Sequence, residues 1–150
     1  MVHVVYTDKT SKEYEKMVNG SKTMVVRGAA GRKIPHSRVF TGDTLYFMVQ
    51  GSKKITATAT VTNVENYVKL TDDQIVELFK KHHSKLQLDE KQIKRWHKKC
   101  LIFVEFENFQ NIEPLDFDHQ SNMDDWLIIE KIDDVVVGTS IPYNYEKSRF

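Results

Sequence analysis

Basic side chains on a short glycine-containing segment are the residues of this 150-residue chain best suited to chemistry. Residues 28–38 read GAAGRKIPHSR; they include Arg32, Lys33 and Arg38 and directly follow Arg27. Glycine lets a ligand approach backbone N–H groups closely, and cationic side chains attract phosphate. We therefore expect an anion-binding loop here. The GxxxxGK[ST] spacing of a nucleotide-binding P-loop is absent.

Lys22 and Arg27 form a second basic pair, five positions apart at the start of a predicted strand. An odd offset along a strand places two side chains on opposite faces. Both cations can line one groove only if Lys22 belongs to the preceding loop, which Gly20 makes plausible. The alternative is a solvated basic loop in which Arg27 pairs with a carboxylate from the acidic C-terminal part of the chain.

Aromatic side chains and one histidine complete the candidate binding set. A cleft that binds a base needs aromatic planes, and Tyr46, Phe47 and Trp126 are candidates. Each of these side chains is also typical of a hydrophobic core. His36, which follows Pro35 in the basic loop, can contact phosphate or act as an acid or base near neutral pH, or have neither role.

Metal binding and nucleophilic catalysis have less support. His82, His83, His97 and Cys100 lie near one another in sequence, but zinc sites usually have tighter paired spacings. We expect no metal and no cofactor. No GxSxG elbow is present, so a binding role is favoured over an enzymatic one. The run KRWHKK at residues 94–99 predicts a solvated helix face, with a secondary nucleic-acid surface as the alternative.

Charge is distributed unevenly along the chain. The net charge is +1, yet residues 1–100 carry 19 Lys and Arg against 10 Asp and Glu, and residues 101–150 carry 3 against 11. A basic body attracts polyanions, whereas scattered solvated lysines are the alternative interpretation. A single cysteine excludes an internal disulfide, and no apolar run reaches the ~18 residues of a membrane span. We expect a cytoplasmic protein with no membrane partner.

Periodicity and capping signals divide the chain into strands and helices. Runs of β-branched and aromatic residues predict strands at residues 2–6, 23–27, 44–50, 55–62, 101–106 and 126–132. Capping-box spacings predict helices that begin at Thr10 (with Glu13), Thr71 (with Gln74) and Asp89 (with Gln92), the first ending at Gly20. Pro114 is expected to close the segment after the fifth strand.

This order of elements predicts an α+β fold. Residues 41–65 predict a hairpin with a two-residue turn, which argues against a doubly wound parallel sheet. We expect a small, mostly antiparallel β-barrel with helices packed at its rim. Residues 1–137 form the expected domain, and residues 138–150 an extended tail whose three aromatics can dock on it.

Residues 20–27, GSKTMVVR, resemble the GxKxxExR motif of the ASCH domain family, within the PUA-like superfamily of small β-barrels. Gly20, Lys22 and Arg27 match the motif, and Val25 stands where the motif has glutamate. A GD turn before a strand, the alternating strand ITATATVT, the helix start LTDDQI and a late WLII strand agree in order. The resemblance covers roughly residues 10–132.

The resemblance implies an RNA-binding or modified-base-binding module, with RNA or a nucleotide-like ligand as partner. Some small bacterial members are amidohydrolases of acetylated cytidine, in which a lysine at the Lys22 position works with a threonine at the Val25 position. Valine has no group that attacks or transfers a proton, so this activity is the alternative rather than the expectation. A protein-interaction adaptor that uses the aromatic tail is a third possibility.

Overall fold

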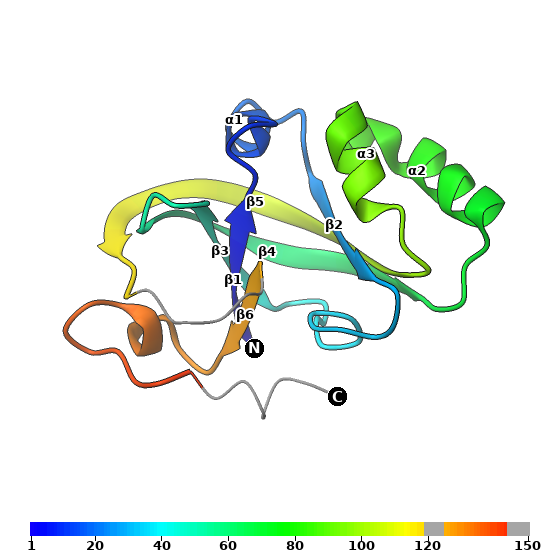
Figure 1. Ribbon diagram of the computed structural model, residues 1–150. Coiled ribbons are helices and arrows are strands. Elements are labelled where there is room, and N and C mark those ends of the chain that lie inside the picture. The colour runs from blue at the N-terminus through cyan, green and yellow to red at the C-terminus, as the bar shows by residue number, and fades with distance from the viewer. Residues whose placement is uncertain (119–124, 144–150) are drawn as a thin grey trace.

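The chain folds around one strongly curled sheet of six strands, with helices against its rim (Figure 1). The computed structural model describes residues 1–118 and 125–143. The strands are β1 (Val2–Thr7), β2 (Met24–Ala29), β3 (Thr44–Val49), β4 (Lys54–Tyr67), β5 (Cys100–Asp116) and β6 (Trp126–Ile129). The helices are α1 (Glu13–Val18), α2 (Asp72–Leu86) and α3 (Glu90–Trp96), and a 3-10 turn spans Ile132–Val135.

The strands follow the order β2-β5-β4-β3-β1-β6. Only the β1–β3 pairing is parallel, and the other neighbours in the order are antiparallel. The predicted α+β class and the mostly antiparallel barrel are therefore confirmed. The barrel is a half-barrel: β2 and β6 are the outer strands of the sheet among the described residues. We call the region between β2 and the β1–β6 side of the sheet the seam.

The predicted hairpin of β3 and β4 supplies much of the core, although four residues, 50–53, connect its strands instead of the two predicted. Ile55, Ala57, Ala59 and Val61 are all buried, while the threonines that alternate with them are half-buried, as the period of two predicts. Phe47, opposite Ala57 in the register, is also buried. Phe47, Ala57, Ala59 and Val61 belong to one buried hydrophobic cluster, which also contains Val25 of β2 and Trp126 of β6.

Two of the three predicted capping boxes are present, and one prediction is wrong. In α2 and α3 the Thr71–Gln74 and Asp89–Gln92 boxes form both of their hydrogen bonds. No such box opens α1, which begins after Lys12 without a side-chain cap. The carboxylate of Asp8 accepts the backbone N–H of Thr10 at 2.9 Å instead, and this turn takes Thr10 away from the capping position.

The fifth strand is longer than predicted. It continues beyond Phe106 to Asp116, so Pro114 lies within β5 and does not close it. Pairing with β2 ends at Glu105, and the later residues of β5 pair with β4. Proline is tolerated on a strand that is paired on one side only. The last strand is shorter than expected and ends at Ile129.

The C-terminal segment begins beside β6. Tyr143 packs against a cluster that includes Val4 and Phe117, and its hydroxyl accepts the backbone N–H of Ile128 at 3.3 Å. The other two tail aromatics, Tyr145 and Phe150, lie outside the described residues. None of the helices in the described part of the chain combines the length and hydropathy needed to cross a bilayer.

Candidate functional site

Arg27 lies on β2 and extends into the seam, where only 6% of the residue is exposed. Its Nη2 donates to the carbonyl of Tyr6 on β1 at 2.8 Å, and its Nη1 donates to the carbonyl of Val26 at 2.8 Å. The guanidinium carbon lies 5.2 Å from the ring centre of Trp96 and 5.8 Å from that of Trp126. Two indoles and two carbonyls thus hold a cation in the open side of the barrel.

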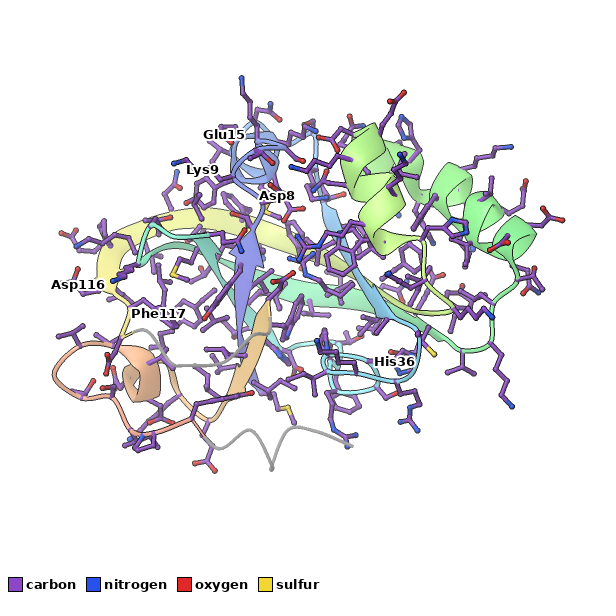
Figure 2. The ribbon with its side chains drawn as sticks, viewed as in Figure 1. Asp8, Lys9, Glu15, His36, Asp116 and Phe117 are labelled. Carbon is purple, nitrogen blue, oxygen red and sulfur yellow. The ribbon has the colours of Figure 1, made fainter. Side chains whose placement is uncertain are left out.

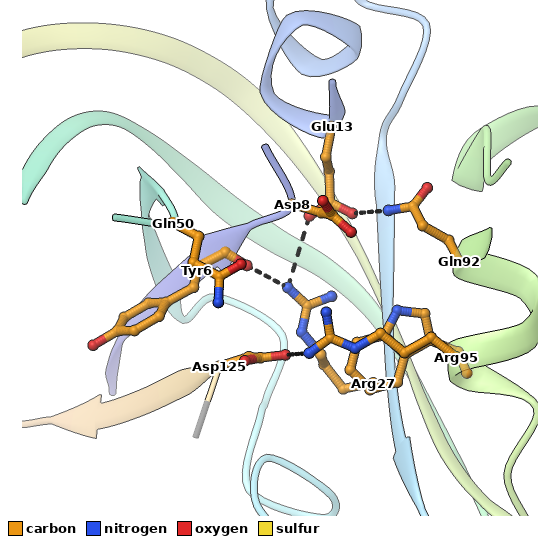
Figure 3. A pocket seen from close by; sticks show the side chains of 9 residues that line it. Tyr6, Asp8, Glu13, Arg27, Gln50, Gln92, Arg95 and Asp125 are labelled. Atoms are coloured by element: carbon orange, nitrogen blue, oxygen red, sulfur yellow. Dashed lines mark hydrogen bonds and ion pairs between the residues drawn. The ribbon is translucent and has the colours of Figure 1, made fainter. Parts of the chain in front are cut away.

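A polar pocket lies beside Arg27, at the place where α1, β1, β2 and α3 meet (Figure 3). Its empty volume is about 240 Å³, which includes the open mouth. The enclosed cavity is only about 10 Å³, room for about one water, so any larger group must lie in the open mouth. The lining residues, which define the seam pocket, are Tyr6, Asp8, Glu13, Arg27, Gln50, Gln92, Arg95, Trp96 and Asp125.

Glu13 is the first residue of α1, and its carboxylate lies at the centre of this site. Only 3% of the residue is exposed. Its Oε1 lies 3.7 Å from Arg27 Nη2, and its Oε2 lies 3.7 Å from Lys22 Nζ. The same Oε2 accepts a hydrogen bond from Gln92 Nε2 at 2.9 Å. One carboxylate therefore faces two cations and an amide donor, all from different elements.

Lys22 lies in the loop before β2, the position in which it and Arg27 can meet. It is 1% exposed, and its Nζ donates to the carbonyl of Leu86 at 2.5 Å. Burial is the main cause that lowers the pKa of Lys22 to about 8, against the opposing attraction of Glu13. Lys22 does not line the seam pocket, but its amine lies 3.7 Å from Glu13, which does.

Two polar atoms of the pocket wall have no hydrogen-bond partner among the described residues. These are Glu13 Oε1 and Arg27 Nε, an acceptor and a donor on residues that are each more than nine-tenths buried. A buried polar atom without a partner costs roughly 1–3 kcal/mol. Their position in the wall of an open pocket indicates that a ligand or an ordered water supplies the missing bonds.

An ion pair borders the pocket. Arg95 of α3 pairs with Asp125, which immediately precedes β6, and the Arg95 guanidinium lies 4.5 Å from the ring centre of Trp96. Arg95 is partly exposed, with 44% of its side chain accessible. Asp8 lines another part of the wall, and hydrogen bonds from Thr10 and Ser11 outweigh the effect of burial and lower its pKa.

Trp126 lies beneath the site rather than open to it, with 1% exposure. Its Nε1 donates to His3 Nδ1 at 3.0 Å, and His3 Nε2 donates to Asp43 Oδ2 at 2.8 Å. The indole therefore supports Arg27 from below as part of a buried Trp–His–Asp chain. Trp96, not Trp126, is the indole that lines the pocket.

The other predicted residues lie elsewhere. Tyr46 is half-buried against the cluster that holds Val4 and Phe117. His36 is buried, its Nε2 lies 3.0 Å from the carbonyl of Tyr67, and its pKa is lowered, mainly by burial. Figure 2 shows His36 well separated from Asp8 at the pocket. None of the predicted loop residues lines the seam pocket, namely Arg32, Lys33, His36 and Arg38.

Glu13 and Gln92 are site residues that the sequence predicted only as partners in capping boxes. Gln92 does cap α3, and it uses its carbonyl oxygen for this, which leaves the amide group for Glu13. No local pattern marks Glu13 as the partner of two cations. Arg95 and Trp96 did carry a signal, the run KRWHKK, which was interpreted as a solvated face.

No group of three or more His, Cys, Asp and Glu side chains within residues 1–118 and 125–143 is arranged to hold a metal ion. No protein-family model matches the sequence, and no curated protein matches it. The comparison with solved structures, in contrast, gives several matches.

The solved structures that match include the ASCH protein of Zymomonas mobilis, with 16% identity, 78% of this chain and 74% of that chain covered, and a TM-score of 0.59. A serine-to-alanine variant of that protein matches with 14% identity, covering 87% of this chain and 89% of the other, at a TM-score of 0.64. A tyrosine-to-phenylalanine variant matches with 15% identity, covering 87% of this chain and 91% of the other, at a TM-score of 0.63. The chain thus has an ASCH-type fold.

Proposed function

We propose that this protein binds RNA or a nucleotide-like ligand and that one base, or a planar group of similar size, lies with its edge at the open mouth of the seam pocket. The observation that carries the proposal is a pair of buried atoms that have no hydrogen-bond partner among the described residues, Glu13 Oε1 and Arg27 Nε, in the wall of an open pocket. An acceptor and a donor in one wall match the edge of a nucleobase, which carries both kinds of group. The binding unit is residues 1–137, with residues 138–150 as its tail.

The remaining wall has the groups that base recognition needs. Gln50 and Gln92 supply amides, and the guanidinium of Arg95 lies over the ring of Trp96. Guanidinium planes and indoles are both surfaces on which bases stack in RNA complexes. Pairing with Asp125 holds Arg95 at the pocket, so a base at its mouth meets preformed polar groups.

The predicted site residues take different parts in this proposal. Arg27 contacts the ligand. Lys22 and Trp126 act from behind, by holding Glu13 and Arg27 in place. Arg32, Lys33 and Arg38 attract phosphate outside the pocket, while His36 anchors their loop through the carbonyl of Tyr67. Tyr46 contributes to packing only.

The surroundings of Lys22 do not favour the amidohydrolase alternative. A lowered pKa increases the fraction of the amine that is neutral, but its Nζ is buried, outside the pocket lining and hydrogen-bonded to a backbone carbonyl. Val25 is fully buried in the core. A substrate in the seam pocket would therefore meet Glu13 and Arg27 before it met Lys22.

The proposal is tested by filling the mouth of the pocket. Gln50→Phe adds an aromatic ring at an exposed lining residue without touching the buried network. Gln110→Phe, at an exposed glutamine of β5, is the matched control. Binding of nucleosides, mononucleotides and a mixed-sequence single-stranded RNA is measured by titration calorimetry and fluorescence anisotropy.

We expect the wild type and Gln110→Phe to bind alike and Gln50→Phe to bind about tenfold more weakly, a loss of ~1.4 kcal/mol. Equal affinity of both variants, or no binding of any of these ligands by the wild type, would contradict the proposal. Incubation with acetylated cytidine, followed by mass spectrometry, distinguishes binding from hydrolysis.

A further inference from the structure

His36 and Ser37, in the loop between β2 and β3, form a pair of side chains outside the lining of the seam pocket. Ser37 Oγ lies 2.8 Å from His36 Nδ1, and Nε2 of the same ring lies 3.0 Å from the carbonyl oxygen of Tyr67 on β4. Figure 2 shows His36 on this loop, well away from Asp8 at the pocket. A hydroxyl beside a histidine that a third group orients is the arrangement that activates a serine nucleophile.

The two hydrogen bonds of the ring determine which nitrogen of His36 carries the proton. A carbonyl oxygen can only accept, so Nε2 donates to Tyr67. In the neutral ring Nδ1 is then an acceptor, and the hydroxyl of Ser37 donates to it. The serine proton therefore already points at the nitrogen that would remove it, as general-base catalysis requires.

The surroundings of His36 keep this ring neutral. Only 5% of the residue is exposed, and burial is the main cause that lowers the pKa of His36 below its ordinary value of 6.5. The charge of Arg32 acts in the same direction, and the hydrogen bond to the Tyr67 carbonyl opposes both. At neutral pH Nδ1 is therefore unprotonated, and the Tyr67 carbonyl remains as an acceptor for the ring once it has taken up a proton.

Ser37 is held in a backbone conformation that presents its side chain away from the sheet. Its φ is 61°, in the left-handed region that residues other than glycine seldom adopt. Asn66 of β4 stabilises this conformation, because its Oδ1 accepts the backbone N–H of Ser37 at 2.8 Å. Ser37 is half-buried, whereas its base is buried. In α/β-hydrolases the nucleophilic serine is likewise held on a sharp, strained turn.

The backbone around Ser37 restricts the class of substrate. The N–H of Ser37 is bonded to Asn66, and the N–H of Arg38 donates to the carbonyl of Pro35 at 2.9 Å. These two N–H groups are therefore not available to an oxyanion, which serine hydrolases stabilise with donors of this kind. The acyl donor must instead be activated by its own leaving group, as an aryl ester is.

We propose that Ser37 is a nucleophile that accepts an acyl group from an activated ester, with His36 as its general base. Ser37 Oγ forms a bond to the acyl carbon, and the bond from that carbon to the leaving oxygen breaks. His36 Nδ1 takes the hydroxyl proton and passes it to the leaving oxygen. The products are an acylated serine and a free phenol or alcohol, so no further reactant is needed. The site is separate from the seam pocket and does not depend on RNA binding.

The test labels the wild-type protein with p-nitrophenyl acetate and, separately, with a fluorophosphonate, and locates the labelled serines by mass spectrometry of peptides. Ser52 is the control within the same chain. It is exposed in the turn between β3 and β4, and its hydroxyl is bonded to the backbone of Lys54 rather than to a histidine. Two variants complete the test: Ser37→Ala removes the nucleophile, and His36→Gln keeps a donor for the Tyr67 carbonyl but removes the base.

We expect Ser37 to be labelled about 100-fold faster than Ser52, and His36→Gln to slow labelling of Ser37 about 100-fold, the effect of one general base. Ser37→Ala should lose this label and keep the slow labelling of Ser52. Equal rates at Ser37 and Ser52 in the wild type would overturn the inference, whether or not the variants fold. Labelling of Ser37 that is as fast in a folded His36→Gln protein would also overturn it, because the serine would then react without its base.

Discussion

Nη2 of Arg27 on β2 donates a 2.8 Å hydrogen bond to the carbonyl oxygen of Tyr6 on β1, although these strands are not neighbours in the sheet. The bond spans the seam, across which the described strands β2 and β1 are not paired. A rigid guanidinium with several donors is suited to this, since it can contact carbonyls on both sides and a carboxylate at once. The residue proposed to meet the ligand is thus also the one that joins the two sides of the half-barrel.

Replacement of Arg27 by methionine should destabilise the fold strongly. It leaves the buried Glu13 without one of its two cations and frees the carbonyl of Tyr6. Removing one partner of a buried ion pair costs about 3–5 kcal/mol, and Arg27→Lys, which keeps the charge, should cost less. The free energy of unfolding in urea measures the effect.

The control for this experiment is Lys80→Met, at a side chain that is 72% exposed. A surface substitution of this kind changes stability by no more than about 0.5 kcal/mol. An Arg27→Met protein as stable as Lys80→Met would show that the guanidinium does not join the two sides of the barrel.

The buried amine of Lys22 should make stability rise with pH in the alkaline range. Its pKa is about 8 when folded and 10.5 as the reference value, chiefly through burial. Between these values the unfolded chain holds a proton that the folded protein has released, so the free energy of unfolding increases with pH. Below pH 8 the Lys22 amine is protonated in both the folded and the unfolded protein, so the folded protein bears the full free-energy cost of burying the charge.

The difference between the wild type and Lys22→Met isolates this effect, with an expected gain for the wild type of about 3 kcal/mol from pH 8 to 10.5. The pKa of Tyr67 is raised to about 12, mainly by its hydrogen bond to Glu65. Tyr67 is present in both proteins, so its contribution to the difference in stability cancels. Parallel curves over this pH range would mean that the Lys22 amine stays protonated in the folded protein.

Local patterns were enough to predict most of the fold. The alternation of buried and half-buried residues in β4 and the capping boxes of Thr71 and Asp89 each depend on residues only a few positions apart in sequence. Few other interactions compete with such local contacts. The capping box predicted at Thr10 is also local, but it does not form because the carboxylate of Asp8 accepts the backbone N–H of Thr10. The extension of β5 depends on its pairing with β4, which lies far away in sequence.

The candidate site was less predictable because its contacts join distant segments. Arg27 was singled out by its motif, but Glu13, which comes from α1, is identified only once β2 and α3 are placed around it. Trp126 illustrates the same limit: its partner, His3, is 123 positions away, and this contact makes the indole a buried support. The sequence was enough to single out Lys22 and Arg27 as candidate site cations. Their shared contact with Glu13 depends on tertiary packing, which local patterns do not reveal.

Gly28 should tolerate no side chain. A Cβ there would lie 2.5 Å from Cδ2 of Leu101 and 2.9 Å from the carbonyl oxygen of Cys100, whereas nothing lies within 4 Å of one on Gly31. Overpacking of this kind costs about 1–3 kcal/mol, so Gly28→Ala should lower the midpoint of urea unfolding and Gly31→Ala should not. Equal midpoints would show that β2 can shift away from β5 at this register.

His3 should make the protein lose stability as the pH falls below its reference pKa of 6.5. Burial is the main cause that lowers the pKa of His3, against the opposing hydrogen bond to Asp43. Below pH 6.5 the unfolded chain therefore binds a proton that the folded protein does not, and stability falls by up to about 1.4 kcal/mol per pH unit. The neutral ring is also the one that accepts the N–H of Trp126.

His3→Gln tests this, because an amide can accept from Trp126 and donate to Asp43 without titrating. The stability of the wild type relative to His3→Gln should fall as the pH is lowered below about 6.5 and stay constant above it. The exposed His83→Gln variant leaves the His3 network intact and should keep the wild-type pH dependence. If His3→Gln shows the same acid loss as the wild type, the proton is taken up elsewhere, and the indole beneath Arg27 does not depend on a neutral histidine.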